Sequence, residues 1–189
     1  MARISREFLE LRLAVKNLDF QSFVIEKLDL SGINFDGVDL SGGSMGRCRL
    51  SNATFRSARL VEADFGYSML QSSDFSNAIA SYAHFENCNL TGSILRGCNL
   101  VGTNFLNSNL TGVDLENSKL ENSNLVGVNA TNARFSGCSL RSTDLSDSDL
   151  LGSDFREATF DEKTLRSIPN SKNWKSSHFD ASIIERISG

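Results

Sequence analysis

Several features are scarce or missing in this chain of 189 residues, which has one proline, one tryptophan, two tyrosines and two histidines. No stretch approaches the roughly eighteen consecutive apolar residues of a membrane-spanning helix, so no such helix is expected. The first sixteen residues interleave charged and apolar side chains and lack the uninterrupted apolar region of a secretion signal. These absences predict a cytoplasmic protein.

Motifs of catalytic and metal-binding chemistry are also missing. The two histidines, His84 and His178, have no carboxylate or nucleophile that the sequence pattern would place beside them. The sequence contains no calcium-binding glycine-aspartate repeat, no phosphate-cradling glycine loop and no histidine pair. We therefore expect no cofactor and no bound metal, and an enzyme is the least supported class of function.

The chain does contain an apolar residue at every fifth position. Every multiple of five from Phe20 to Leu165 is apolar, which makes thirty consecutive windows, and the smallest of these centres are Ala80 and Ala130. The residue two before each centre is mostly small, and the residue just before it is often Asp or Asn. Asp and Asn favour turns because they hydrogen-bond to nearby backbone groups, and this role explains the many aspartates better than proton transfer does.

The period of five fits neither a helix, which repeats apolar residues about every 3.6 positions, nor a strand, which repeats them at every second position. It indicates short extended pieces joined by turns, four of which would close a square coil. Thirty windows would make seven and a half coils, stacked at about 4.8 Å into a rod about 36 Å long. The centres expected to fill its core include Phe35, Phe55, Phe65, Phe75, Phe85, Phe105, Leu90 and Leu110.

This pattern resembles the A(D/N)LXX motif of the pentapeptide-repeat family. The motif is carried almost unchanged by Ala63-Asp64-Phe65, Cys88-Asn89-Leu90, Cys98-Asn99-Leu100 and Ser153-Asp154-Phe155. The resemblance covers about residues 18–165 and implies an all-β fold, a right-handed quadrilateral β-helix. It implies much less about function, because one fold serves many roles.

The two ends of such a rod need covers, since a last coil otherwise exposes unpaired strand edges and an open core. Residues 1–17 are predicted to form an N-terminal cap with a short helix at 5–13, and 18–165 to form the β-helix. Residues 166–189, with a short helix from Ala181 to Ile187, are predicted to cap the other end, to pair two copies, or to do both. The residues expected to take these roles are Trp174, Phe179, Ile183, Ile184 and Ile187. The resemblance implies the dimer, because topoisomerase-protecting members pair through their C-terminal segment.

The four cysteines are interpreted as core residues. Cys48, Cys88, Cys98 and Cys138 all lie two positions before a centre. The pairs that share a corner are two coils apart, about 9.6 Å on strand spacing, which exceeds disulfide reach. No CxxC motif is present, so we expect free thiols in a reducing compartment.

The charge of the repeat region bears on one function that the resemblance implies. Some family members mimic DNA, bind DNA gyrase or another type II topoisomerase, and protect it from quinolones or peptide toxins. Duplex DNA carries one negative charge per about 1.7 Å, so a mimic of this length would need roughly 20. Residues 18–160 carry 17 acidic and 10 basic side chains, and no loop interrupts the windows between 18 and 165. Gyrase binding is therefore the alternative hypothesis.

An apolar cluster at outward positions favours a different role. Windows twenty residues apart share a face, and the first two faces carry Val61, Ile79, Tyr82, Val101, Leu106 and Val126 around one edge. Such a cluster is typical of a contact surface, although distortion around the small centre Ala80 would also explain Ile79. The sequence predicts a non-catalytic, rigid module that binds a protein partner, with no direct contact to nucleic acid or membrane.

Overall fold

The computed structural model describes residues 6–7, 9–10 and 24–188, and over this part the period of five is a period of burial. Every centre from Ile25 to Phe155 is at most 2 % exposed, and all eight predicted core centres are among them. The residue two positions before each centre is also buried from Ile33 to Ala158. Two side chains of every five therefore point inward.

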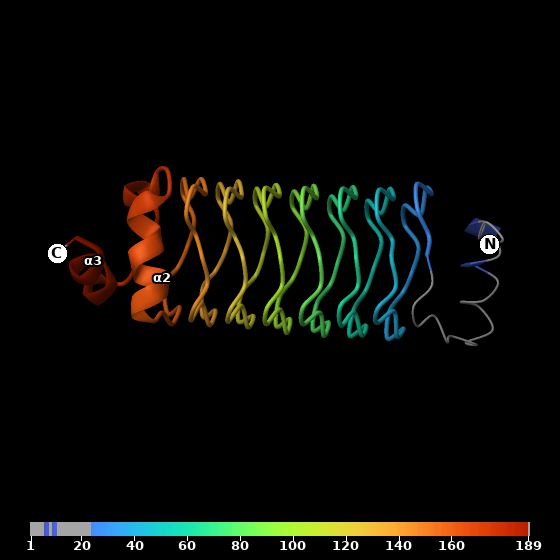
Figure 1. Ribbon diagram of the computed structural model, residues 1–189, viewed down its shortest axis with the longest axis horizontal. Coiled ribbons are helices and arrows are strands. Elements are labelled where there is room, and N and C mark those ends of the chain that lie inside the picture. The colour runs from blue at the N-terminus through green and yellow to red at the C-terminus, as the bar shows by residue number, and fades with distance from the viewer. Residues whose placement is uncertain (1–5, 8, 11–23, 189) are drawn as a thin grey trace.

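Four windows make one coil, because the backbone pairs with itself twenty residues further on. Parallel bridges join residues 24 and 44, 29 and 49, 34 and 54, and so on in steps of five to 139 and 159. The amide of Leu30 donates to the carbonyl of Arg49 at 2.7 Å, and equivalent bonds follow along the rod. The coils stack in a row along the long axis, and the two chain ends lie at opposite ends of the row (Figure 1). The fold is a β-helix.

The corners of each coil are tight turns with a left-handed second residue. From Lys27 to Glu157, every second turn residue has a φ between 55° and 72°. This conformation suits Gly and Asn, and a positive φ at the third residue of a four-residue turn is the geometry of a type II turn. The residue before each centre supports the turn: Asn89 Oδ1 accepts from the Thr91 amide at 3.1 Å and from its hydroxyl at 2.7 Å. The hydrogen-bonding role predicted for the Asp and Asn residues is therefore confirmed.

The N-terminal half of the interior is held by stacked phenylalanines. Phe55 stacks on Phe35 and Phe75 at centroid distances of 4.9 and 4.6 Å. On the next face Phe65 stacks on Phe85 at 4.9 Å and meets Phe55 edge-on at 5.5 Å. Such aromatic pairs contribute about 0.5–1.5 kcal/mol each beyond the burial of their area.

At the N-terminal end, the described residues Arg6, Glu7, Leu9 and Glu10 are helical. Leu9 is fully buried, and the Arg6 guanidinium donates to the carbonyls of Asp29 and Ser31 at 3.3 and 3.2 Å. These contacts place the helix against the first described coil. The rest of the predicted helix at 5–13 and of the predicted cap at 1–17 lies outside the described residues.

At the C-terminal end, the turns give way to helix α2 (Glu162–Ser167), which lies across the end of the stack (Figure 1). Its N-cap is Asp161, whose Oδ1 accepts from the Thr164 amide at 3.0 Å. This bond holds the pKa of Asp161 well below its usual range. The windows were expected to run to Leu165, but α2 begins three residues earlier. The N-cap Asp161 ends the series of turns and starts the helix. Leu165 is therefore a residue of α2, and it is still buried.

The remaining tail consists of two short 3-10 helices, η1 (Ile168–Asn170) and η2 (Trp174–Ser176), and helix α3 (Ala181–Ser188). Lys172 and His178 bridge to Asp149 and Asp154, so the tail pairs with the edge of the last coil. Phe179 stacks on Phe155 at 4.8 Å and continues the aromatic column. Within the described part of the chain, none of the helices has the length and apolar content to cross a membrane.

Candidate interaction surface

The four cysteines lie in the interior of the rod as unreactive thiols. All four are buried and free, and the thiol of Cys98 donates to the Phe75 carbonyl at 2.9 Å. Burial raises the pKa of Cys88, Cys98 and Cys138 to about 12, so these thiols stay protonated at neutral pH. Serines at equivalent positions make the same bond, as when Ser118 donates to Leu95 at 2.6 Å. The cysteines are therefore core residues without nucleophilic character.

No candidate metal site is found among the described residues, since no three or more His, Cys, Asp and Glu side chains gather suitably. A polar cluster with a histidine forms around His84, whose Nδ1 lies 3.0 Å from Glu86 Oε1. The same carboxylate oxygen accepts from Asn104 Nδ2 at 2.6 Å. The prediction that no carboxylate lies beside His84 is therefore wrong. The residues on either side of a centre both point outward, and that spacing would have revealed the pair.

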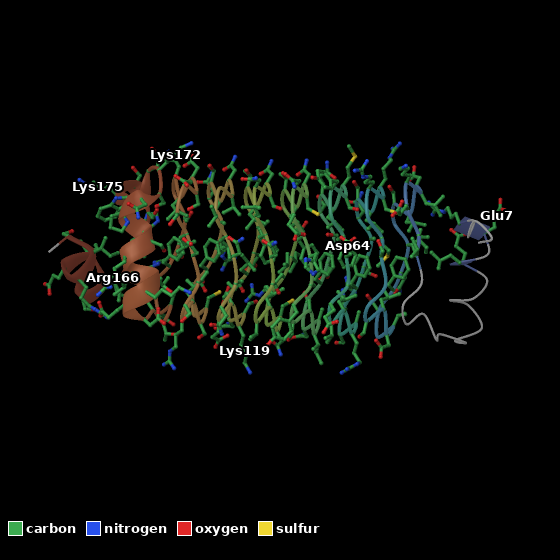
Figure 2. The ribbon with its side chains drawn as sticks, viewed as in Figure 1. Glu7, Asp64, Lys119, Arg166, Lys172 and Lys175 are labelled. Carbon is green, nitrogen blue, oxygen red and sulfur yellow. The ribbon has the colours of Figure 1, made fainter. Side chains whose placement is uncertain are left out.

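The candidate surface lies on the face built from residues 63–65, 83–85, 103–105 and 123–125, called here the second face. Its outward column runs through Asp64, His84, Asn104 and Asn124, which are joined by consecutive bridges. The turns that enter this face form the first corner, and the turns that leave it form the second corner. Figure 2 shows the side chains along the rod, with Asp64 in its N-terminal half.

Five of the six predicted patch residues are divided between the two corners, so the patch does not surround one edge. Val61, Tyr82 and Val101 belong to the first corner, with Ile79 on the face before it, whereas Leu106 and Val126 belong to the second corner. Tyr82 is 57 % exposed and Ile79 37 %, while the four others are half-buried. The patch therefore borders the second face on two sides.

Tyr82 lies flat along the first corner because the next coil has a glycine there. A Cβ at Gly102 would come within 2.6 Å of the Tyr82 ring. The amide of Tyr82 donates to the Val101 carbonyl at 2.9 Å, so the two residues are neighbours on adjacent coils of this corner. Similar pairs recur along the rod, where asparagines replace the tyrosine: Asn77 over Gly97, Asn107 over Gly127, Asn117 over Gly137 and Asn132 over Gly152.

Tyr67 on the second corner was missing from the predicted patch. It is 61 % exposed, and the guanidinium of Arg47 lies 5.2 Å from its ring centroid. Tyr67 and Tyr82 both have a φ near 60°, and they are the aromatic residues with a positive φ in the described part of the chain. This conformation costs a side chain about 1–2 kcal/mol relative to the right-handed one. An aromatic residue at the turn position of Gly and Asn is the sequence signal that would have found Tyr67.

Beside Tyr67, the second corner is hollowed. Gly46 and Gly66 stand on consecutive coils where other turns carry a side chain, and the open hollow has a volume of about 490 Å³. Its lining includes Glu26, Asp64 and Glu86 together with Arg47 and Leu106. Asp64 Oδ1 accepts from the Gly66 amide at 2.8 Å. We refer to this feature as the glycine hollow.

The face built around Asp74, Ile94 and Asp114 has a contrasting electrostatic character, because its acids are paired. Arg56 Nε lies 2.7 Å from Asp74 Oδ2. Arg96 Nη2 and Arg134 Nη2 lie 3.0 and 2.7 Å from Glu116 Oε2. Opposite charges alternate along this face, so it offers no continuous negative column.

The last candidate site is a groove at the C-terminal end, with a volume of about 210 Å³, between Trp174, Phe179 and Ile184. Of the three isoleucines expected on one side of α3, Ile183 and Ile187 pack against the core cluster. Ile184 is 44 % exposed. Two isoleucines thus attach α3 to the rod, and the third is left on the surface.

Comparisons with known proteins agree with this fold. Residues 70–145 match the family described as pentapeptide repeat region, and residues 33–66 match pentapeptide repeats (8 copies). No match was found among curated protein sequences. Among solved structures, HetL is a pentapeptide repeat protein involved in heterocyst differentiation regulation from the cyanobacterium Nostoc sp. strain PCC 7120. It is 19 % identical with a TM-score of 0.49, and the match covers 94 % of this chain and 95 % of HetL.

Two further solved structures are similar at comparable levels. QnrB1, a plasmid-mediated fluoroquinolone resistance protein, is 22 % identical with a TM-score of 0.44, and the match covers 91 % of each chain. A pentapeptide repeat protein from the Arabidopsis thaliana thylakoid lumen is 22 % identical with a TM-score of 0.40. That match covers 73 % of this chain and 72 % of the plant protein. At these identities the likeness concerns the fold alone.

Proposed function

Because the chain belongs to the pentapeptide-repeat family, we propose that it acts as a non-catalytic, rigid protein-interaction module. The observation that carries this proposal is that the cysteine, aspartate and asparagine side chains have structural roles. The cysteines donate to carbonyls of neighbouring coils, and aspartates and asparagines support turns. What remains for function is the outer surface, where two exposed tyrosines lie on the corners of one face.

The proposed contact surface is the second face together with the residues that border it, which are Val61, Ile79, Tyr82, Val101, Leu106 and Val126. Apolar side chains that border polar groups on a rigid face are typical of protein contacts, in which aromatic residues are enriched. A rigid rod would lose little conformational freedom on binding, which favours affinity. The free thiols support a reducing compartment, and we place the module in the cytoplasm, acting without direct contact to nucleic acid or membrane.

Binding to DNA gyrase or another type II topoisomerase as a DNA mimic, with protection from quinolones or topoisomerase toxins, is the alternative. The pairing of Arg96 and Arg134 with Glu116 weighs against it, because a mimic needs an uninterrupted series of negative charges. The partner is therefore proposed to be a protein recognised through the second face.

We further propose that the C-terminal segment caps the rod and leaves room for a second copy. Leu165 and Ile168 cover the core, and Ile183 and Ile187 attach α3. The groove beside Trp174 and the exposed Ile184 form the surface through which a homodimer would pair.

Val101→Asp is expected to abolish partner capture while the fold persists. The side chain is half-buried beside Tyr82, so the new carboxylate would interrupt the contact without entering the core. The immobilised chain is exposed to an extract of its native host, and captured proteins are quantified by mass spectrometry. We expect the partner to fall at least about tenfold, as for loss of a central contact.

The matched control is Gln71→Asp, which adds a carboxylate at the same turn position on the opposite corner, where the side chain is also half-buried. It should capture as much partner as the wild type. Equal capture by the Val101 and Gln71 variants would dismiss this surface. Recovery of gyrase subunits, together with inhibition of supercoiling, would replace the proposal with its alternative.

A further inference from the structure

We infer that the glycine hollow is the docking site for a basic, extended segment of the protein partner, whose arginine or lysine side chain enters it. This inference rests on the proposed function and deepens it by naming the chemistry of the partner.

The hollow exists because of residues that the backbone does not require. Neither Gly46 nor Gly66 has the positive φ that favours glycine, since both are first residues of their turns. A Cβ at Gly46 would meet no atom closer than 3.5 Å, so an ordinary side chain would fit there. Two consecutive glycines at such positions leave a concave surface where the corner would otherwise project.

The shape of the hollow suits an extended chain. Its lining runs along the corner from Glu26 to Leu106, a span of four coil spacings or about 19 Å. At about 3.3 Å per residue, an extended segment of roughly six residues covers that length. A segment laid along the corner would place alternate side chains toward the rod.

The charges of the hollow select a cation. Asp64 and Glu86 lie on its wall, and neither has an arginine or lysine within 4.0 Å among the residues that the structure describes. Glu86 Oε1 has two neutral neighbours, the ring of His84 at 3.0 Å and Asn104 Nδ2 at 2.6 Å. The acids of the face around Asp74 and Asp114 differ, because Arg56, Arg96 and Arg134 pair with them. An incoming guanidinium or ammonium group therefore meets carboxylates whose ion-pairing capacity is unused.

Tyr67 adds a second, independent feature. Its ring is 61 % exposed and is part of the lining of the hollow. Arg47 already lies over the ring, which shows that a guanidinium can approach it. An aromatic wall beside carboxylates is suited to a basic side chain with an apolar stem.

The test measures binding of a fluorescein-labelled hexa-arginine peptide by fluorescence anisotropy at two salt concentrations. The double variant Asp64→Asn, Glu86→Gln is expected to weaken binding at least about tenfold and to lower its salt dependence. Both replacements keep a side-chain oxygen, and asparagine supports the same turn elsewhere, as Asn104 Oδ1 does for the Leu106 amide at 3.1 Å. Gly46→Leu, which fills the hollow, is expected to weaken binding to a similar extent.

Two matched controls separate the hollow from general charge. Asp144→Asn removes one carboxylate from the same column and keeps its bond to the Ser146 amide. Ser146→Leu places a leucine at the same turn position of the same corner, five coils from Gly46. Each should change affinity less than about twofold. No binding by the wild type, or equal losses in controls and hollow variants, would overturn the inference. If the peptide fails while Val101 still governs partner capture, the docking site alone is wrong.

Discussion

Replacing Phe65 with alanine is expected to lower the free energy of unfolding by about 3–5 kcal/mol, the usual cost of removing a buried aromatic side chain. The ring is fully buried, stacks on Phe85 at 4.9 Å and meets Phe55 and Phe75 edge-on. A coil cannot collapse into the gap because bridges to both neighbouring coils fix its backbone. Denaturant unfolding followed by circular dichroism provides the measurement.

The control for Phe65 is Met69→Ala in the same coil. Met69 is 50 % exposed, so its truncation should change the free energy of unfolding by less than about 0.5 kcal/mol. Similar effects of the two variants would contradict the assignment of inward and outward positions. The comparison tests the period of five on two residues only four positions apart.

Ile168→Ala is expected to cost about 2–5 kcal/mol, because this side chain helps to cover the core at the C-terminal end of the rod. Ile168 is fully buried at the start of η1, directly after α2. Loss of the cover would also expose apolar surface and an unpaired edge, so we expect aggregation to begin at lower temperature than in the wild type. Thermal unfolding with light scattering measures both effects.

Ile184→Ala is the matched control, since Ile184 is 44 % exposed on α3 and should be nearly neutral. A loss as large as that of Ile168 would show that α3 is part of the cover. The same light-scattering measurement on a chain ending at Asp180 tests the pairing proposal. A dimer that survives the truncation would assign α3 to capping alone.

The fold could be predicted from the sequence because the pattern of buried residues that determines it repeats every five positions. A solenoid with one apolar centre in five has the same environment in every window, so position alone says which side chains are buried. The end of the repeats was less predictable. Leu165 keeps the apolar count, but Asp161 caps a helix and stops the turns before the count ends.

The surface was predicted less well, for physical reasons. The period says which side chains point outward but not how corners divide them, so Leu106 and Val126 were grouped with Tyr82 although they border the other side of the face. The glycine hollow arises from side chains that are missing at Gly46 and Gly66 on stacked coils, and a count along the chain reads them simply as turn residues. Ile184 was predicted for the cap or for pairing, and it stays exposed because helix α3 turns only part of its apolar side, Ile183 and Ile187, toward the rod.

The two tyrosines connect stability with function. Both occupy left-handed turn positions, which elsewhere are held by Gly and Asn and also by Ser, Glu, Asp, Lys and Arg, and both are more than half exposed. We propose that binding uses the exposed rings, at a cost to the free energy of folding relative to asparagine.

The most direct measurement is the amount of partner captured by the double variant Tyr67→Asn, Tyr82→Asn relative to the wild type, with thermal unfolding of both proteins. The account predicts that asparagine fits both turns, so the unfolding temperature does not fall, whereas capture falls at least about tenfold. Capture at the wild-type level by this fully folded variant would contradict the claim that the second face carries the function.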